Sequence, residues 1–116
     1  MFTCKPIDMS FYETASQRFV FERELATNPN QLFDVFEDEH SWPQWAPGIA
    51  RVTWTSERPF GVGTTRTVQF IGGMEVYEDF IAWERGKQMA FGFTGTTQRV
   101  WWAFGENYEV TDLGNN

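Results

Sequence analysis

The chain has little of several features on which many protein functions depend. It holds one cysteine and one histidine in 116 residues. The single cysteine, Cys4, cannot form an internal disulfide, which fits a reducing compartment. No apolar run approaches the ~20 residues of a membrane-spanning helix, and the first ten residues lack the apolar core of a signal peptide. We therefore expect a cytoplasmic protein that does not span a membrane.

Basic residues are also scarce. Nine lysines and arginines stand against 16 acidic residues, so the net charge is −7 and the isoelectric point is near 4.6. Nucleic-acid binding requires a basic surface that displaces counterions, and anionic membranes attract basic segments. The charge therefore excludes both as expected partners.

The scarcity of histidine limits metal and nucleophile chemistry. His40 follows the acidic run Glu37–Asp38–Glu39, but such runs at helix ends are usually solvated, and catalytic zinc needs convergent ligands. Cys4 lies far from His40 in the sequence, which disfavours a nucleophile–base pair. We expect no metal and no nucleotide cofactor. Gly61 and Gly63 do not form a phosphate loop, because no Lys–Ser/Thr ending or helix follows them.

Aromatic residues, in contrast, are abundant. Twelve phenylalanines, six tryptophans and three tyrosines make up 18% of the chain. Such residues form thick cores, and they also line pockets for flat or greasy ligands. Core packing is the commoner explanation, and the length suits one domain with one core.

The pattern along the chain predicts an α+β fold. Residues 1–17 are weakly patterned and form an N-terminal arm, whereas 18–25 alternate as a half-buried strand. A helix then begins after Thr27 or Asn28, has Pro29 in its first turn and ends in the acidic run 37–39. A second helical turn follows at about 41–45. The predicted strands after it span 51–56, 64–70, 74–83, 88–94 and 99–111.

The apolar sets of these strands predict their register. Joining the even-numbered sets of 64–70 and 74–83 places Phe70 opposite Met74 across a loop at 71–73, where glycines suit positive φ angles. The same register places Arg66 opposite Glu78 on the inner face.

Two further hairpins continue the inner face. A four-residue loop at 84–87 connects the even set to Met89, Phe91 and Phe93. A loop at 95–96 or 95–98 then connects Phe91 and Phe93 to Val100, Trp102 and Phe104. The result is an antiparallel meander with one inner face.

The predicted helices are too short to cover this face. Several side chains are therefore expected to remain partly exposed, namely Val68, Phe70, Val76, Phe80, Phe91, Trp102, Phe104, Tyr108 and Val110. A large exposed apolar patch usually indicates a missing cover or a partner. We expect that a further strand and a covering helix are absent from this chain. The alternative is that a second copy covers the face as a homodimer.

Several motifs together resemble one known superfamily. They are SWPQW (41–45), PFGVGTTRTVQF (59–70), GGMEVYEDFIAWERG (72–86) and MAFGF (89–93). With the predicted strand and helices before them, they are similar to START-like (SRPBCC) proteins, and in particular to bacterial polyketide cyclase/dehydrase-like members, over about 18–113.

The resemblance implies a helix-grip fold, in which a curved antiparallel sheet wraps a long C-terminal helix with a cavity between them. It implies a START-like domain over 18–116 that is incomplete at its C-terminus, because the last strand and long helix are not in this sequence. The superfamily includes lipid carriers, receptors and aromatase/cyclases, and a fold alone does not fix function.

Arg66 and Glu78 are the sharpest candidate site residues. Opposite charges on an apolar concave face should pair, because an unpaired buried charge is costly. They could orient the polar end of a ligand, with Glu78 as a weak candidate acid/base. The structural interpretation, a cross-strand salt bridge that fixes register, is favoured.

The other candidate ligand-binding residues are apolar or aromatic. Trp42 and Trp45 could form a lid or wall at the cavity mouth, although capping the open end of the sheet is favoured. For the residues deeper in the face, core packing is equally expected. These are Val68, Phe70, Phe80, Phe91, Phe93, Trp102, Phe104 and Tyr108.

We expect a protein that binds a small hydrophobic or aromatic, lipid- or polyketide-like molecule, rather than an enzyme. One alternative is a polyketide cyclase/aromatase or dehydrase, for which Glu78, Tyr108 and the outward-pointing Tyr77 are the nameable proton-transfer groups. A second alternative is a protein-interaction module that uses its uncovered sheet.

Overall fold

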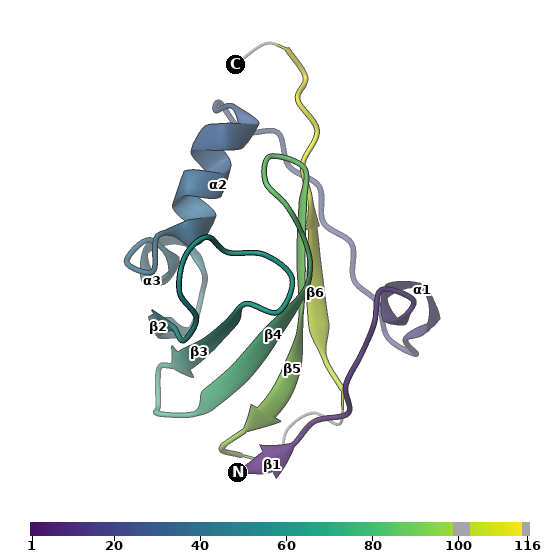
Figure 1. The fold of residues 1–116 in the computed structure, drawn as a ribbon, viewed down its shortest axis with the longest axis vertical. Coiled ribbons are helices and arrows are strands. Elements are labelled where there is room, and N and C mark those ends of the chain that lie inside the picture. The colour runs from purple at the N-terminus through teal and green to yellow at the C-terminus, as the bar shows by residue number, and fades with distance from the viewer. Residues whose placement is uncertain (99–102, 115–116) are drawn as a thin grey trace.

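A computed structural model describes residues 1–98 and 103–114 of the chain. One curved antiparallel sheet forms the body, with two helices packed at one side of it and a short helix beyond the opposite edge (Figure 1). The strand order is β1-β5-β4-β3-β2, and β6 also pairs with β5. The elements are β1 Phe2–Thr3, α1 Phe11–Thr14, α2 Pro29–Glu37, α3 Trp42–Trp45, β2 Ile49–Trp54, β3 Thr65–Phe70, β4 Glu75–Glu84, β5 Gln88–Thr96 and β6 Gly105–Glu109.

The helix α2 begins where the sequence predicts. The Asn28 side chain accepts a hydrogen bond of 2.8 Å from the Gln31 amide, and Pro29 takes the first turn, where no amide donor is needed. The face of α2 that carries Phe33 and Phe36 is buried against the sheet. The predicted second helical turn is confirmed as α3.

The β3–β4 register is also confirmed. Arg66 pairs with Glu78, and the Phe70 amide donates to the Met74 carbonyl at 2.8 Å. In the loop between these strands Gly72 and Gly73 have φ angles of 103° and 102°, which side chains rarely adopt.

The predicted four-residue loop of the β4–β5 hairpin is wrong. Glu84 pairs with Gln88, so the loop has three residues. A bulge between Phe80 and Ala82 adds the missing residue to β4, and Phe80 still pairs with Phe91. Because the bulge shifts the alternation, Trp83 rather than Ala82 turns toward the helices, where its ring packs on Phe33.

The predicted hairpin between β5 and β6 is wrong in register. Phe91 pairs with Glu106 and Met89 with Tyr108, whereas the predicted loops at 95–96 and 95–98 place Val100 or Trp102 opposite Phe91. The physical reason is that β5 continues to Thr96, where β1 rather than the next strand takes its edge. The predictions for Val100 and Trp102 lie outside the described residues.

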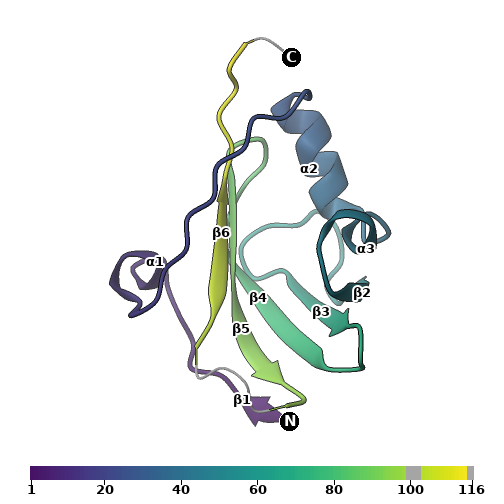
Figure 2. The ribbon, with the colours of Figure 1, turned by 180° about the vertical axis from the view of Figure 1, so that it is seen from behind.

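The predicted strand at 18–25 is not formed. The connection from α1 to α2 runs past β6 in both views without entering the sheet (Figures 1 and 2). Phe19 and Phe21 are 81% and 89% exposed. Alternating residues provide a face to bury, but a strand also needs hydrogen bonds to a neighbouring edge, which this segment does not make. The boundary between arm and domain remains a prediction.

The expectation of a partly exposed inner face is wrong for its centre. Val68, Val76, Phe80 and Phe91 are at most 1% exposed. The large aromatic rings of α2, α3, β2 and β4 fill the concave side. Helices as short as these would leave it open if their side chains were small. Of the predicted residues, four stay half-buried: Phe70 at the end of β3, and Phe104, Tyr108 and Val110 in or next to β6.

The N-terminal arm packs on the opposite face of the sheet. Gly92 and Gly105 pair across β5 and β6, and a Cβ atom at either would lie within about 2.5 Å of Ile7. The Tyr12 hydroxyl donates to the Phe91 carbonyl at 2.7 Å and lies 3.1 Å from the Glu106 carbonyl. The arm therefore braces the strands that carry Phe91 and Glu106.

Candidate functional site

A buried ion pair lies at the centre of the concave face. Neighbouring positions of β3 and β4 place Nε of Arg66 2.5 Å from Oε1 of Glu78. The two side chains are only 1% and 3% exposed. Removing two charges from water is costly, so this pair requires strong compensation from its surroundings.

Aromatic rings surround the Arg66 guanidinium. Its Cζ atom lies 4.3 Å from the ring centroid of Trp42 and 4.8 Å from that of Phe91. Phe80 and Trp54 follow at 5.2 Å and 5.4 Å. Each ring face attracts the cation. The helix α3 and strands β2, β4 and β5 together build this aromatic cage, defined here as Trp42, Trp54, Phe80 and Phe91.

One nitrogen of the guanidinium is left without an acceptor. Nη1 of Arg66 is buried and makes no hydrogen bond to the described residues. A buried donor without a partner costs roughly 1–3 kcal/mol. Nη1 of Arg66 could therefore donate a hydrogen bond to an oxygen atom that enters the cage.

Burial also changes the acidity of Glu78. Its pKa is raised from 4.5 to about 7 by loss of solvent, and the charge and hydrogen bond of Arg66 oppose this shift. The charge of Glu106 raises the pKa of Glu78 further. A carboxyl group that titrates near neutral pH can both accept and release a proton.

Glu106 is a site residue that sequence reasoning missed. It pairs with Phe91 and thus faces the concave side, and the Tyr108 hydroxyl lies 3.4 Å from its Oε1. Partial burial raises the pKa of Glu106, and Arg66 opposes the shift. Because the residue as a whole is exposed to solvent, we expect a smaller effect than at Glu78. The even-numbered pattern of Phe104 and Tyr108 could have indicated it.

Tyr108 completes the polar edge of the site. Its ring packs on Phe36 and Trp42 with centroids 5.4 Å and 6.3 Å apart. Burial, followed by the charge of Glu106, raises the pKa of its hydroxyl. Tyr108 therefore stays protonated and donates to Glu106 at neutral pH.

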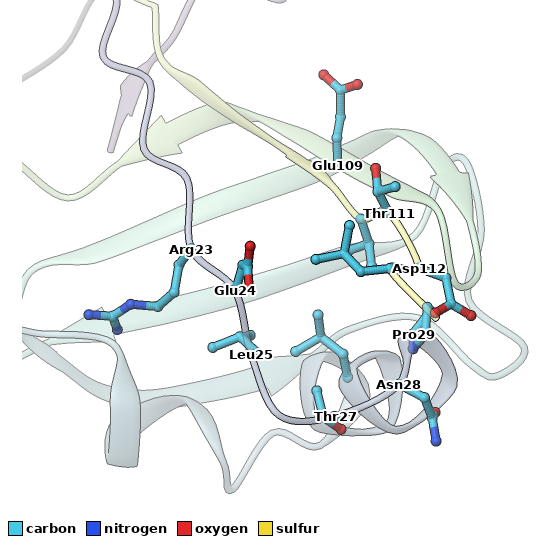
Figure 3. Close-up of a pocket in the computed structure, with 12 residues that line it drawn as sticks. Arg23, Glu24, Leu25, Thr27, Asn28, Pro29, Glu109, Thr111 and Asp112 are labelled. Atoms are coloured by element: carbon cyan, nitrogen blue, oxygen red, sulfur yellow. The ribbon is translucent and has the colours of Figure 1, made fainter. Parts of the chain in front are cut away.

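The clearest hollows lie away from the aromatic cage. One, of about 120 Å³, is lined by residues 23–25, 27–29 and 109–113 and by Leu32 (Figure 3). A wider, open groove of about 790 Å³ lies between the start of α2, the β4–β5 hairpin and residues 110–112. Neither hollow is lined by Arg66 or by a residue of the aromatic cage.

Comparison with known proteins now gives the chain a family. The sequence profile described as polyketide cyclase/dehydrase and lipid transport matches residues 16–116. The chain belongs to this family. Its START-like resemblance is thereby confirmed, and the α+β fold with a curved, unclosed sheet is consistent with a helix-grip fold.

Proteins of mycobacteria are among the relatives that the chain matches. Uncharacterized proteins of Mycobacterium bovis and Mycobacterium tuberculosis are 46% identical to the chain over 110 residues. The alignment covers 95% of this chain and 66% of those proteins, so the chain spans just under two thirds of their length. No solved structure matches the chain significantly.

In this family member the predicted apolar site residues lie at three depths. Trp42, Val68, Phe80, Phe91 and Phe93 are buried, and Phe70, Phe104 and Tyr108 are half-buried. Trp45 is 42% exposed, and its ring contacts that of Trp42 in a tilted arrangement with centroids 4.4 Å apart. Trp102 lies outside the described residues. Their role in ligand binding remains a prediction.

His40 lies at the surface, beyond the end of α2. His40 is largely exposed, and its Nε2 lies 3.9 Å from Glu39. Within 1–98 and 103–114, no group of three or more potential ligands could hold a metal ion. In the same ranges no helix is long and apolar enough to cross a bilayer.

Proposed function

We propose that this protein binds a small hydrophobic or aromatic molecule against its concave face, with Arg66 as the polar anchor. The observation that carries the proposal is the buried Nη1 donor without an acceptor inside the aromatic cage. An oxygen atom of a ligand would satisfy this donor, and the rings would supply apolar contact.

Entry to the cage requires one wall to move. Trp42 covers Arg66 from α3, a helix of four residues whose other tryptophan, Trp45, is partly exposed. The half-buried end of the face lies along β6, at Phe104 and Tyr108. We propose that a ligand enters from the β6 side and displaces the Trp42 ring. Burial of its apolar area, at ~25 cal/mol per Å², would supply the affinity.

A second candidate is a cyclase/aromatase or dehydrase activity, and Glu78 favours it. With a pKa of about 7, Glu78 can take a proton from a carbon flanked by two carbonyl groups. Arg66 Nη1 would then donate to the enolate oxygen that forms. Tyr108, whose hydroxyl stays protonated, could supply a proton to the product.

Native mass spectrometry of the purified protein tests the binding proposal first. We expect an apolar adduct on the wild-type protein that Arg66→Met loses. Arg51→Met is a matched control, because Arg51 is exposed on β2, and it should keep the adduct. A ligand-free wild type that dimerises with concentration would contradict the proposal and favour a protein-interaction module.

The enzyme candidate needs a separate readout. A β-diketone-containing substrate should be converted by the wild type and bound without conversion by Glu78→Gln. If the wild type binds such chains but never converts them, the protein is a binding protein and the second candidate is excluded.

A further inference from the structure

The concave face carries one positive group and two carboxyl groups. Arg66 and Glu78 pair across β3 and β4, and Glu106 faces the same side from β6. These groups influence one another, because Arg66 lowers the pKa of both carboxyl groups and Glu106 raises that of Glu78. The three groups together carry a net charge of −1 with both carboxylates ionised and zero with one protonated. Because Arg66 stays protonated, the site becomes positive only when both carboxyl groups are protonated.

Within the part of the chain that the structure describes, no second cation offsets the negative charge of this site. Arg66 is the cation that lowers the pKa values of Glu78, Glu106 and Tyr108 there. The helix α3 carries no charged side chain. The acidic residues of α2, Asp34 and Glu37, are bound to Arg85 and Arg58 instead.

Two tyrosines are the other titratable groups near the carboxyl groups. Tyr108 donates to Glu106 from the same strand. Tyr12 approaches from the opposite face of the sheet, where its hydroxyl is bound to backbone carbonyls. Both stay neutral near pH 7, because burial raises the pKa of each. They therefore leave the charge of the site unchanged.

We propose that this face selects apolar molecules whose polar group is uncharged, such as a ketone, an ester or a phenol, and rejects the same chain ending in a carboxylate. The inference rests on the proposed function, since it concerns the ligand that Arg66 would anchor. It adds a rule for the chemistry of that ligand.

The hydrogen-bond geometry explains the preference. A carbonyl oxygen can accept from Arg66 Nη1 while Nε keeps its bond to Glu78. A carboxylate would compete with Glu78 for the same guanidinium, and its charge would meet Glu106 as well. A like charge brought close to the buried Glu78 carboxylate opposes binding, and the exposed Glu106 adds a smaller repulsion.

A matched pair of probes tests this rule. We would titrate the protein with 2-dodecanone and with dodecanoate, two chains of equal carbon number, at pH 8, where the acid is ionised. Calorimetry or tryptophan fluorescence gives both dissociation constants. We expect the ketone to bind at least about tenfold more tightly. Equal affinity, or tighter binding of dodecanoate, would overturn the inference.

Two isosteric variants separate a local charge effect from the net charge. Glu106→Gln should tighten dodecanoate binding at least about threefold and leave the ketone unchanged. Glu109→Gln removes the same charge from an exposed residue on the other face of β6, so it should leave the ratio as in the wild type. If both variants change the ratio equally, Glu106 has no local role and the rule is wrong.

The same titrations distinguish failure of the rule from failure of the proposed function. If both probes bind equally and Arg66→Met abolishes both, the proposed function stands and only the charge rule is lost. If neither probe binds the wild type, or if Arg66→Met binds both as well as the wild type does, Arg66 is not an anchor. Both proposals then fall together.

Discussion

The protein has two clusters of charged residues that differ in their burial and in their number of hydrogen-bond partners. At the surface, Arg85 bonds Asp34, Glu37 and the Asn30 carbonyl, and Arg58 bonds Glu37 from the other side. In the interior, Arg66 has a single carboxylate partner and a ring of aromatic side chains. The surface cluster makes several hydrogen bonds at a place where water could also bond these groups. The interior pair makes one hydrogen bond at a place that water does not reach.

The difference indicates what each cluster is for. The surface cluster fastens α2 to the β4–β5 hairpin through several modest interactions, and Glu37 at its centre is 17% exposed. The interior pair is a weak source of stability, because desolvation offsets much of the attraction. Replacing a buried ion pair by apolar side chains of similar volume is often neutral or stabilising. We infer that a requirement other than stability maintains Arg66 and Glu78.

Replacing Arg66 alone gives the largest expected effect. Arg66→Met leaves Glu78 buried without its cation, and we expect a loss of about 3–5 kcal/mol in the free energy of unfolding above pH 7. The loss should be smaller at pH 5, where Glu78 takes up a proton. Urea unfolding at both pH values measures it.

The double variant Arg66→Met/Glu78→Leu sharpens the comparison. If the pair exists for function, this variant should be at least as stable as the wild type and should lose ligand binding. A double variant that is as unstable as Arg66→Met would show that the pair itself holds the fold together, and the contrast with the surface cluster would disappear.

The pH dependence of stability is the second largest effect. The pKa of Glu78 is about 7 in the folded protein and near 4.5 when unfolded. The folded state therefore holds a proton that the unfolded state releases. The resulting stability is complete below about pH 4.5 and is lost as the pH rises through 7, by about 3 kcal/mol. Urea unfolding from pH 5 to pH 8 should show this decline.

Glu78→Gln is the matched control for that decline. Its amide oxygen can still accept from Arg66, but it does not titrate. Only the difference between wild type and variant reports Glu78, since Glu106 shifts in the same direction. A difference that stays constant with pH would mean that Glu78 has an ordinary pKa, and the case for proton transfer would be lost.

The sequence predicted the interior pair but not its surroundings. Alternation and turn length place Arg66 opposite Glu78, because the side-chain period of a strand permits one register per inner face. The covering of this pair by Trp42 depends on how α3 folds back over the sheet. That arrangement is a tertiary contact with no local pattern.

The errors also have physical causes. Alternation alone does not predict the bulge near Ile81, which changes the residue that faces inward, or the extension of β5 to Thr96, which shifts the pairing. Glu106 was missed for a related reason. The predicted loops at 95–96 or 95–98 place Val100 or Trp102 opposite Phe91, whereas Glu106 takes that position.

The surface cluster gives the smallest effect, and it completes the comparison. We expect Arg85→Gln to lower the free energy of unfolding by about 1 kcal/mol, because Arg85 is 38% exposed and water replaces part of each lost bond. The loss should shrink in 1 M salt, which screens exposed charges, whereas the effect of Arg66→Met should persist.

Among the three variants, we expect Lys87→Gln to change the free energy of unfolding least. Lys87 and Glu84 are 73% and 66% exposed and 3.4 Å apart, so the change should be about 0.3 kcal/mol or less. Thermal unfolding of the three variants at low and high salt then ranks the clusters by burial. If Arg85→Gln were as costly as Arg66→Met and equally insensitive to salt, burial would not distinguish the two clusters. The reason for assigning function to the interior pair alone would then be gone.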